Sequence, residues 1–220
     1  MTSKYIKSIP SGEVGGAFKV SFWGRFSGAS ILLLMVALFV TSCSDDDDGV
    51  FDEAWKQKNE EAFAGIAKNP EYNEIKSQGN NGSIYYKVLK KGEEGAKKIF
   101  YNSRAEVYYK GFYVATNENI KAGDVFDHKL FEDGSPYYIA VSSAVMSTDS
   151  YGNVIVPSVI EGWTVALQEM VVGDKWEVWI PYQLAYGQYD VYNNGRLTMK
   201  GSTTLAFEIE LVKAIDFNEF

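Results

Sequence analysis

The spacing of hydrophobic positions divides the chain into a helical part and a strand-rich part. Between Asp52 and Lys68, apolar side chains recur every three or four residues, which predicts one amphipathic helix. Asp52 is placed to cap its start, and Asn69-Pro70 is placed to end it. We expect this helix to dock on its own domain, because one short helix is marginal alone; pairing with a second copy, which would make a homodimer, is the alternative. The polar stretch 71–82 predicts a linker or turn.

After residue 82 the pattern changes to alternation of apolar and polar positions, with many β-branched and aromatic residues. This predicts strands over the segments 83–90, 105–114, 136–141, 175–181 and 203–214. Between the third and the fourth, the segment 161–170 carries an apolar face with helical spacing. No internal repeat is visible, which argues against a solenoid. The sequence therefore predicts an α+β domain, with a mainly antiparallel β-sheet and one short central helix.

The N-terminal part reads as a targeting segment. The apolar run Ile31–Val40 follows several basic residues and is too short to span a bilayer. Two small residues then lead to Cys43, the only cysteine, an arrangement typical of a secretory signal peptide. Val40-Thr41-Ser42-Cys43 resembles the lipobox of bacterial lipoproteins, which implies that Cys43 carries acyl chains such as palmitate. A buried free thiol is the weaker alternative.

Four consecutive aspartates, Asp45–Asp48, follow the cysteine and repel one another, so they cannot pack. They read either as a solvated tether or, by resemblance, as the export signal of surface-displayed lipoproteins. We therefore expect an exported lipoprotein held in the outer membrane by its lipid and exposed on the cell surface, with a periplasm-facing position as the alternative. The expected organisation is a signal peptide over 1–42, a lipidated acidic tether over 43–50, the helix and linker over 51–82, and a folded domain over 83–220.

Charge and composition narrow the chemistry. The chain has 29 acidic and 21 basic residues, so its net charge of -8 argues against nucleic acid as a partner. One cysteine and one histidine exclude an internal disulfide framework and a cysteine-rich zinc site. We therefore expect no cofactor and no metal.

Blocks of the folded domain resemble the FKBP-type peptidyl-prolyl cis-trans isomerases in order and spacing. Val107–Gly111 and Val125–Asp127 resemble the V-H-Y-x-G and F-D signatures, and Val159–Trp163 resembles the V-I-x-G-W opening of the family's helix. Ala185–Gly187 resembles the Y-A-Y-G turn, and 204–211 resembles the closing strand. The resemblance covers about residues 83 to 213 and implies an FKBP-like antiparallel sheet wrapped on a short helix.

The resemblance also implies an apolar cavity that accepts a prolyl ring, with Trp163 as its floor. The catalytic positions that it implies are Tyr109, Asp127, Ile160, Trp163 and Tyr186. The substrate-binding positions that it implies are Phe126, Tyr137, Val159, Met199 and Phe207. In this scheme Tyr186 and the Ile160 amide hydrogen-bond the bound peptide, and Asp127 is the acidic group beside the cavity. Taken one by one, each aromatic is more often an ordinary core residue.

The function implied is isomerisation of X-Pro bonds in proline-containing clients, which assists the folding of exported or surface proteins. This chemistry needs no nucleophile and no metal, because no bond is broken when the amide rotates. The alternative is a non-catalytic chaperone-like or surface interaction lipoprotein that uses the same cavity.

Two segments bear on the surroundings of the cavity: one is longer than the family pattern, and the other is a loop that the resemblance places over the cavity. Residues 142–158 are an insertion, with Tyr151-Gly152-Asn153 as the expected turn. The loop 188–201, with Asn193-Asn194-Gly195 as the expected hairpin tip, should overhang the cavity. Outside these segments, His128 is expected on the surface, and Glu208 and Glu210 on a solvated strand face.

Overall fold

The computed structural model describes residues 52–114 and 124–220. The predicted signal peptide, the lipobox with Cys43 and the acidic run lie outside the described residues. Within the described part, no helix is both long enough and apolar enough to cross a membrane.

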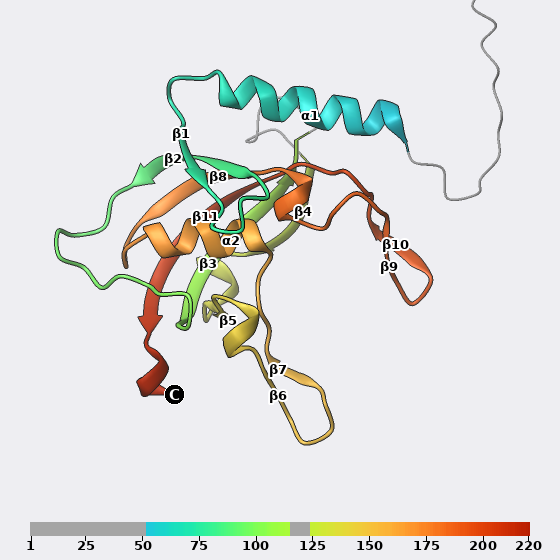
Figure 1. The fold of residues 1–220 in the computed structure, drawn as a ribbon. Helices are drawn as coiled ribbons and strands as arrows, with labels where there is room; N and C mark the ends of the chain where they lie inside the picture. Colours follow the sequence, from blue (N-terminus) through green and yellow to red (C-terminus); the bar gives the residue numbers. More distant parts are fainter. Residues whose placement is uncertain (1–51, 115–123) are drawn as a thin grey trace, which may run out of the picture. The chain divides into compact units, whose positions relative to one another are not determined.

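The main sheet runs in the order β1-β2-β8-β11-β3-β4, with β5 also paired to β3, and all its pairings are antiparallel (Figure 1). Its strands are β1 (Asn73–Lys76), β2 (Ser83–Lys90), β3 (Arg104–Tyr113), β4 (Asp124–Lys129), β5 (Tyr137–Ala140), β8 (Lys175–Ile180) and β11 (Leu205–Ile215). The two helices described are α1 (Glu53–Ala67) and α2 (Glu161–Glu169). The prediction of an α+β domain is confirmed, and the five predicted strands are present to within one or two residues at each end.

The expectation of a linker or turn over 71–82 is right only for the second half of the stretch, because residues 73–76 form β1 and the turn after them pairs β1 with β2. The turn is closed by the Ser77 amide, which donates to the Gly82 carbonyl at 2.9 Å. β1 lies at the edge of the sheet, and of its four residues only Ile75 is partly buried. An edge strand with so little burial carries mostly polar residues. Its composition is therefore hard to distinguish from that of a turn.

Alternation along the central strands gives the sheet two buried faces. In β8, Trp176, Val178 and Ile180 pack with α2, whereas Trp179 belongs to a second cluster on the opposite face. That second cluster is covered by α1, through Phe63 and its neighbours. Figure 1 shows α1 and α2 on opposite sides of the sheet. A fully buried strand with both faces covered is apolar at nearly every position.

Helix α1 docks on its own domain, as expected. Asp52 caps it, since its Oδ1 accepts a hydrogen bond from the Trp55 amide at 2.8 Å. Asn59 is fully buried, and its Oδ1 accepts from the Thr204 amide at 2.7 Å while its Nδ2 donates to the Trp55 carbonyl at 2.9 Å. The bond from the Thr204 amide to Asn59, together with the edge-to-face contact of Phe63 with Tyr85, fixes α1 to the sheet. Pairing of two copies through this helix stays a prediction.

Both predicted hairpins are present. The insertion forms β6 (Ser147–Thr148) and β7 (Val154–Val156) around a turn that includes Gly152 at a φ of 85°. The loop after residue 188 forms β9 (Val191–Asn193) and β10 (Arg196–Met199). Asn194 and Gly195 both have positive φ at the tip, as a two-residue hairpin turn requires.

Candidate active site

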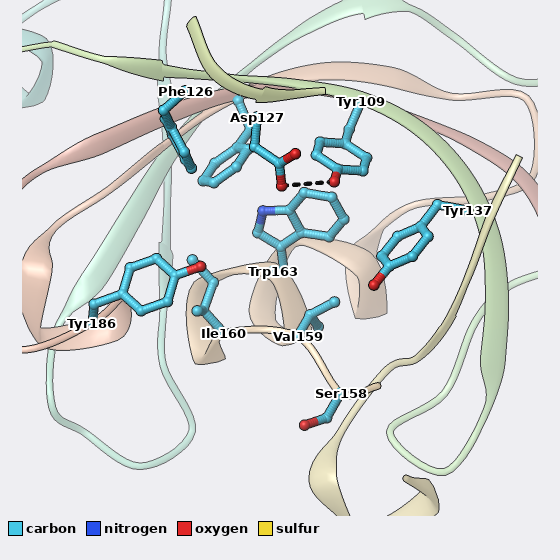
Figure 2. A pocket seen from close by; sticks show the side chains of 10 residues that line it. Tyr109, Phe126, Asp127, Tyr137, Ser158, Val159, Ile160, Trp163 and Tyr186 are labelled. Carbon is cyan, nitrogen blue, oxygen red and sulfur yellow. Dashed lines mark hydrogen bonds between the residues drawn. The ribbon is translucent and has the colours of Figure 1, made fainter. Parts of the chain in front are cut away.

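A cavity of about 150 Å³ opens beside the N-terminus of α2 (Figure 2). Its ten lining residues come from β3, β4, β5, β11, the segment that leads into α2, α2 itself and the turn after β8. They are Tyr109, Phe126, Asp127, Tyr137, Ser158, Val159, Ile160, Trp163, Tyr186 and Phe207. Segments separated by about a hundred residues thus meet at one site.

The approach of α2 to the sheet places one half of the cavity. A Cβ added at Gly162 would overlap Ile180 of β8, so glycine allows the helix to lie against the strand. The Thr164 hydroxyl donates to the Val141 carbonyl at 2.6 Å and ties the same helix to the end of β5. Ile160 stands at the N-cap in an extended conformation, and Trp163 follows in the first turn.

Trp163 forms the floor and is 4% exposed. It makes edge-to-face contacts with Tyr109 and Phe207, with ring centroids at 5.1 and 5.2 Å. Phe207 in turn meets Phe126 edge to face at 5.6 Å. Such arrangements match the positive edge of one ring to the negative face of the next. Each wall ring is therefore held by the others rather than by the strand alone.

Gly111 makes room for the aromatic wall. A Cβ at this position would lie 2.8 Å from Cε1 of Phe207 and 2.9 Å from Cε1 and Cζ of Phe126. These distances are shorter than carbon atoms tolerate, so the two rings lie across β3 only because the side chain is absent. The sequence marked Gly111 as part of a signature, but its packing role was missed.

Tyrosine hydroxyls and one carboxylate supply the polar groups. The Tyr109 hydroxyl donates to Asp127 Oδ2 at 2.8 Å, the dashed line in Figure 2. The pKa of Tyr109 is raised well above its usual value, mainly by burial and also by this bond to Asp127. Burial and the Asp127 charge also raise the pKa of Tyr137 and of Tyr186, whose hydroxyls both point into the space below Trp163. All three hydroxyls are thus neutral donors at physiological pH.

Nine of the ten predicted site residues line this cavity; Met199 does not. Met199 is 6% exposed and packs in the main core, where the register shift after Leu197 turns it away from the hairpin. Ser158 also lines the cavity and was not predicted. A serine at this position gives no indication of a binding role. No residue of the described loop 188–201 lines the cavity either, and the expected overhang stays a prediction.

The remaining candidate groups lie outside the cavity. His128 is exposed, as expected. Glu208 pairs with Lys175 and Glu210 with Lys90, each at 3.1 Å, which suits a solvated strand face. Among residues 52–114 and 124–220, no cluster of three or more His, Cys, Asp or Glu side chains is placed to hold a metal ion.

Comparison with known proteins agrees with this architecture. The family model of FKBP-type peptidyl-prolyl cis-trans isomerases matches residues 95–212, more than half of the chain. A macrophage infectivity potentiator from Trypanosoma cruzi is 29% identical over 136 residues, which are 62% of this chain and 55% of that protein. The outer membrane protein MIP of Legionella longbeachae is 44% identical over 57 residues, 26% of this chain and 23% of that one. The chain thus spans only part of the length of these relatives.

Among solved structures, a peptidyl-prolyl cis-trans isomerase from Pseudomonas syringae pv. tomato is similar, with a TM-score of 0.55 and 26% identity. The match covers 78% of this chain and all of that one. Fold and family model therefore agree over the region that builds the cavity, and the chain belongs to the FKBP-type peptidyl-prolyl cis-trans isomerase family.

Proposed function

We propose that this protein is an active peptidyl-prolyl cis-trans isomerase that acts on X-Pro bonds of exported or surface polypeptides. The observation that carries the proposal is the cavity itself, where an aromatic floor and walls meet the hydrogen-bonded pair Tyr109 and Asp127. Its volume is about 150 Å³, and eight of its ten lining residues are aromatic or aliphatic.

The reaction requires only that rotation about one amide bond becomes easier. Resonance sets a barrier of about 18–20 kcal/mol to this rotation. An apolar cavity disfavours the polar planar form of the amide relative to the twisted transition state, in which resonance is lost. Trp163, Phe126 and Phe207 supply that dry environment. No proton transfer and no covalent step are needed.

The polar groups serve to hold the chain that carries the proline. The Ile160 amide and the Tyr186 hydroxyl are donors for the carbonyls of the bound peptide. Asp127 lines the cavity with its carboxylate oriented by Tyr109, and we expect it to face the carbonyl that rotates. Interactions of this kind raise the rate only when they are stronger in the twisted state than in the ground state.

The test is a proline-isomerisation assay on a short X-Pro peptide, with the purified protein. Trp163→Ala and Tyr186→Ala should lower turnover by at least tenfold, whereas Tyr189→Ala should not, since Tyr189 is exposed three residues further on and does not line the cavity. Circular dichroism checks the fold, because Trp163→Ala costs about 3–5 kcal/mol as a large-to-small core change. A folded Trp163→Ala protein with unchanged turnover would refute the site assignment.

For its location, we propose acylation at Cys43 and display on the outer membrane. The support is the lipobox-like sequence and the aspartates behind it. The name of the Legionella relative, an outer membrane protein, is consistent with this location. Cys43→Ser should release the protein from membrane fractions, because no other cysteine can accept the lipid. Replacing Asp45–Asp48 by alanine should reduce protease accessibility on intact cells; unchanged accessibility would refute surface export but not lipidation.

A second candidate is a holder that binds unfolded clients through the same cavity without accelerating rotation. Exposed apolar side chains outside the cavity, such as Tyr151 and Ile155, favour it. Asp127→Ala separates the two functions when isomerisation and suppression of client aggregation are measured on one preparation. Loss of turnover with retained suppression supports a catalyst. Absence of turnover in the parent protein supports the holder.

A further inference from the structure

The inserted hairpin β6–β7 has a packed root and an apolar tip. At the root, Val145 and Val156 are buried against Ala140 of β5. Towards the tip, Tyr151 is 90% exposed, Ile155 61% and Val154 54%. An exposed apolar cluster on a short hairpin stabilises nothing within the domain, and such surfaces are typical of binding sites.

The tip is ordered by its own hydrogen bonds rather than by these apolar side chains. Asp149 Oδ1 accepts from the amides of Tyr151 and Asn153 at 2.9 and 2.8 Å. Its Oδ2 accepts from Asn153 Nδ2 at 2.8 Å, and its amide donates to the Asn153 carbonyl at 2.9 Å. The turn is thus fixed by one polar network, which leaves the neighbouring apolar residues free for contact with another molecule.

Charged side chains are sparse around the hairpin: Arg104 of β3 donates from Nε and Nη2 to the Val145 carbonyl at its root, at 3.3 and 3.2 Å. Between Asp133 and Glu161, Asp149 is the only charged residue in the sequence, and its carboxylate is engaged in the turn. The chain as a whole carries 23% charged residues. A neutral apolar surface in an acidic protein suits a partner that offers aliphatic and aromatic side chains.

The hairpin is continuous with the cavity. Two residues after β7 come Ser158 and Val159, both of which line the cavity. The join is held by the Ala140 amide, which donates to the Pro157 carbonyl at 2.9 Å, and by the bridge between Ala140 and Ser158. Figure 1 shows the hairpin projecting away from the sheet beyond α2. Its orientation relative to the cavity is therefore set by β5.

We propose that the β6–β7 hairpin is an arm that binds an extended, unfolded polypeptide through aliphatic and aromatic side chains several residues from the proline. This inference rests on the proposed isomerase function and specifies its substrate class. Seven residues separate Tyr151 from Ser158, so at about 3.3 Å per residue the arm reaches roughly 20 Å. A tetrapeptide in the cavity spans about 13 Å and does not reach the tip, whereas a peptide of twelve residues does.

Three synthetic peptides with the same central Phe-Pro test the proposal: a tetrapeptide, a twelve-residue peptide with Leu and Phe in the flanks, and a twelve-residue peptide with Ser and Glu there. The variant Tyr151→Ser/Val154→Thr/Ile155→Thr removes the apolar tip but keeps Asp149 and the turn. The matched control Phe217→Ser/Val88→Thr changes similarly exposed residues that do not line the cavity. We measure kcat/KM for each peptide and, independently of turnover, binding by fluorescence anisotropy.

The kcat/KM of the parent protein should be at least fivefold higher on the apolar twelve-residue peptide than on the tetrapeptide. On the twelve-residue peptide with Ser and Glu it should be no higher than on the tetrapeptide. The tip variant should lose this gain and the matching anisotropy signal while it keeps its tetrapeptide rate, and the control should keep both. The arm is overturned if the parent protein has equal kcat/KM on the tetrapeptide and the apolar twelve-residue peptide. It is also overturned if the tip variant keeps the parent's kcat/KM and anisotropy signal on the apolar twelve-residue peptide. Concentration-dependent dimerisation that the tip variant abolishes, without any peptide effect, would make a second copy the occupant and also overturn it.

Failure of the two proposals is distinguishable. If the parent accelerates none of the peptides, the isomerase function fails, and anisotropy alone then decides whether the arm binds the apolar peptide. If the parent accelerates the tetrapeptide but the tip changes nothing, only the arm fails.

Discussion

Replacing Gly111 by alanine should damage the cavity through a residue that never touches the substrate. The new Cβ would lie 2.8 Å from Phe207 and 2.9 Å from Phe126, whereas carbon atoms in contact prefer about 3.5–4.0 Å. The rings must therefore give way by about 0.7 Å or more. Phe207 is held at 5.2 Å by Trp163, which is itself buried, so the space that is open to the rings is the cavity.

Overpacking of a well-filled site typically costs about 1–3 kcal/mol. If half of that cost, about 0.5–1.5 kcal/mol, falls on the bound state, kcat/KM for a tetrapeptide should decrease by about twofold to twelvefold. The fold should persist, because φ at Gly111 is not positive and β3 keeps its pairing with β11. The effect should be larger on KM than on kcat, since a smaller cavity excludes the proline before rotation begins.

Gly65→Ala is the matched control. It lies in α1, and a Cβ there meets nothing within 4 Å. Alanine in an exposed helix should stabilise the protein by about 0.4–1 kcal/mol and leave kcat/KM unchanged. Thermal denaturation and the tetrapeptide assay are run on both variants. An unaltered kcat/KM and melting temperature in Gly111→Ala would refute the argument that this glycine sets the position of the rings.

Three further predictions concern the hydrogen bonds. Tyr109→Phe keeps the ring contact with Trp163 but removes the donor to Asp127. Turnover in the peptide assay should therefore decrease by about threefold to tenfold. An unchanged rate would contradict a role for that bond. The pKa of Tyr109 is raised in the folded state, so its contribution to stability is complete below about pH 10 and is lost as the pH rises further. Between about pH 10 and 11.5, the melting temperature should therefore decrease less steeply in Tyr109→Phe than in the parent protein. Equal slopes in the two proteins would contradict this contribution of Tyr109. Asn59→Ala leaves the buried Thr204 amide without its acceptor and should lower the free energy of unfolding by about 1–3 kcal/mol, whereas a smaller loss would mean that α1 contributes little.

Local patterns predicted the elements that carry strong periodic signals. β8 alternates between the two buried faces, and Glu161–Glu169 presents Trp163, Leu167 and their neighbours to the core with helical spacing. The turn at Gly152 and the tip at Asn194-Gly195 followed from residue types that favour positive φ. β1 was missed because an exposed edge strand carries no apolar signal.

The convergence of the site was not a local property. Tyr109 and Phe207 lie close together because β3 and β11 are paired. This pairing cannot be predicted from the residues of either strand alone. Only the order of signature blocks indicated which side chains share a cavity, and Met199, which was expected there, is not among the lining residues. There a single register shift in a short hairpin decides which way the side chain turns. Ser158 was missed because the backbone, not its side-chain type, brings it to the rim.

Two absent side chains determine the dimensions of the cavity. Gly162 allows α2 to approach β8, which fixes the depth at which Trp163 lies, and Gly111 allows Phe126 and Phe207 to cross β3. The rings themselves are interchangeable with others of similar shape, as long as any hydroxyl reaches water or a partner. A glycine has no such substitute, because any Cβ at these two positions occupies space that a neighbour already fills. The shape of the cavity therefore depends as much on how closely the backbone elements approach one another as on the side chains that line it.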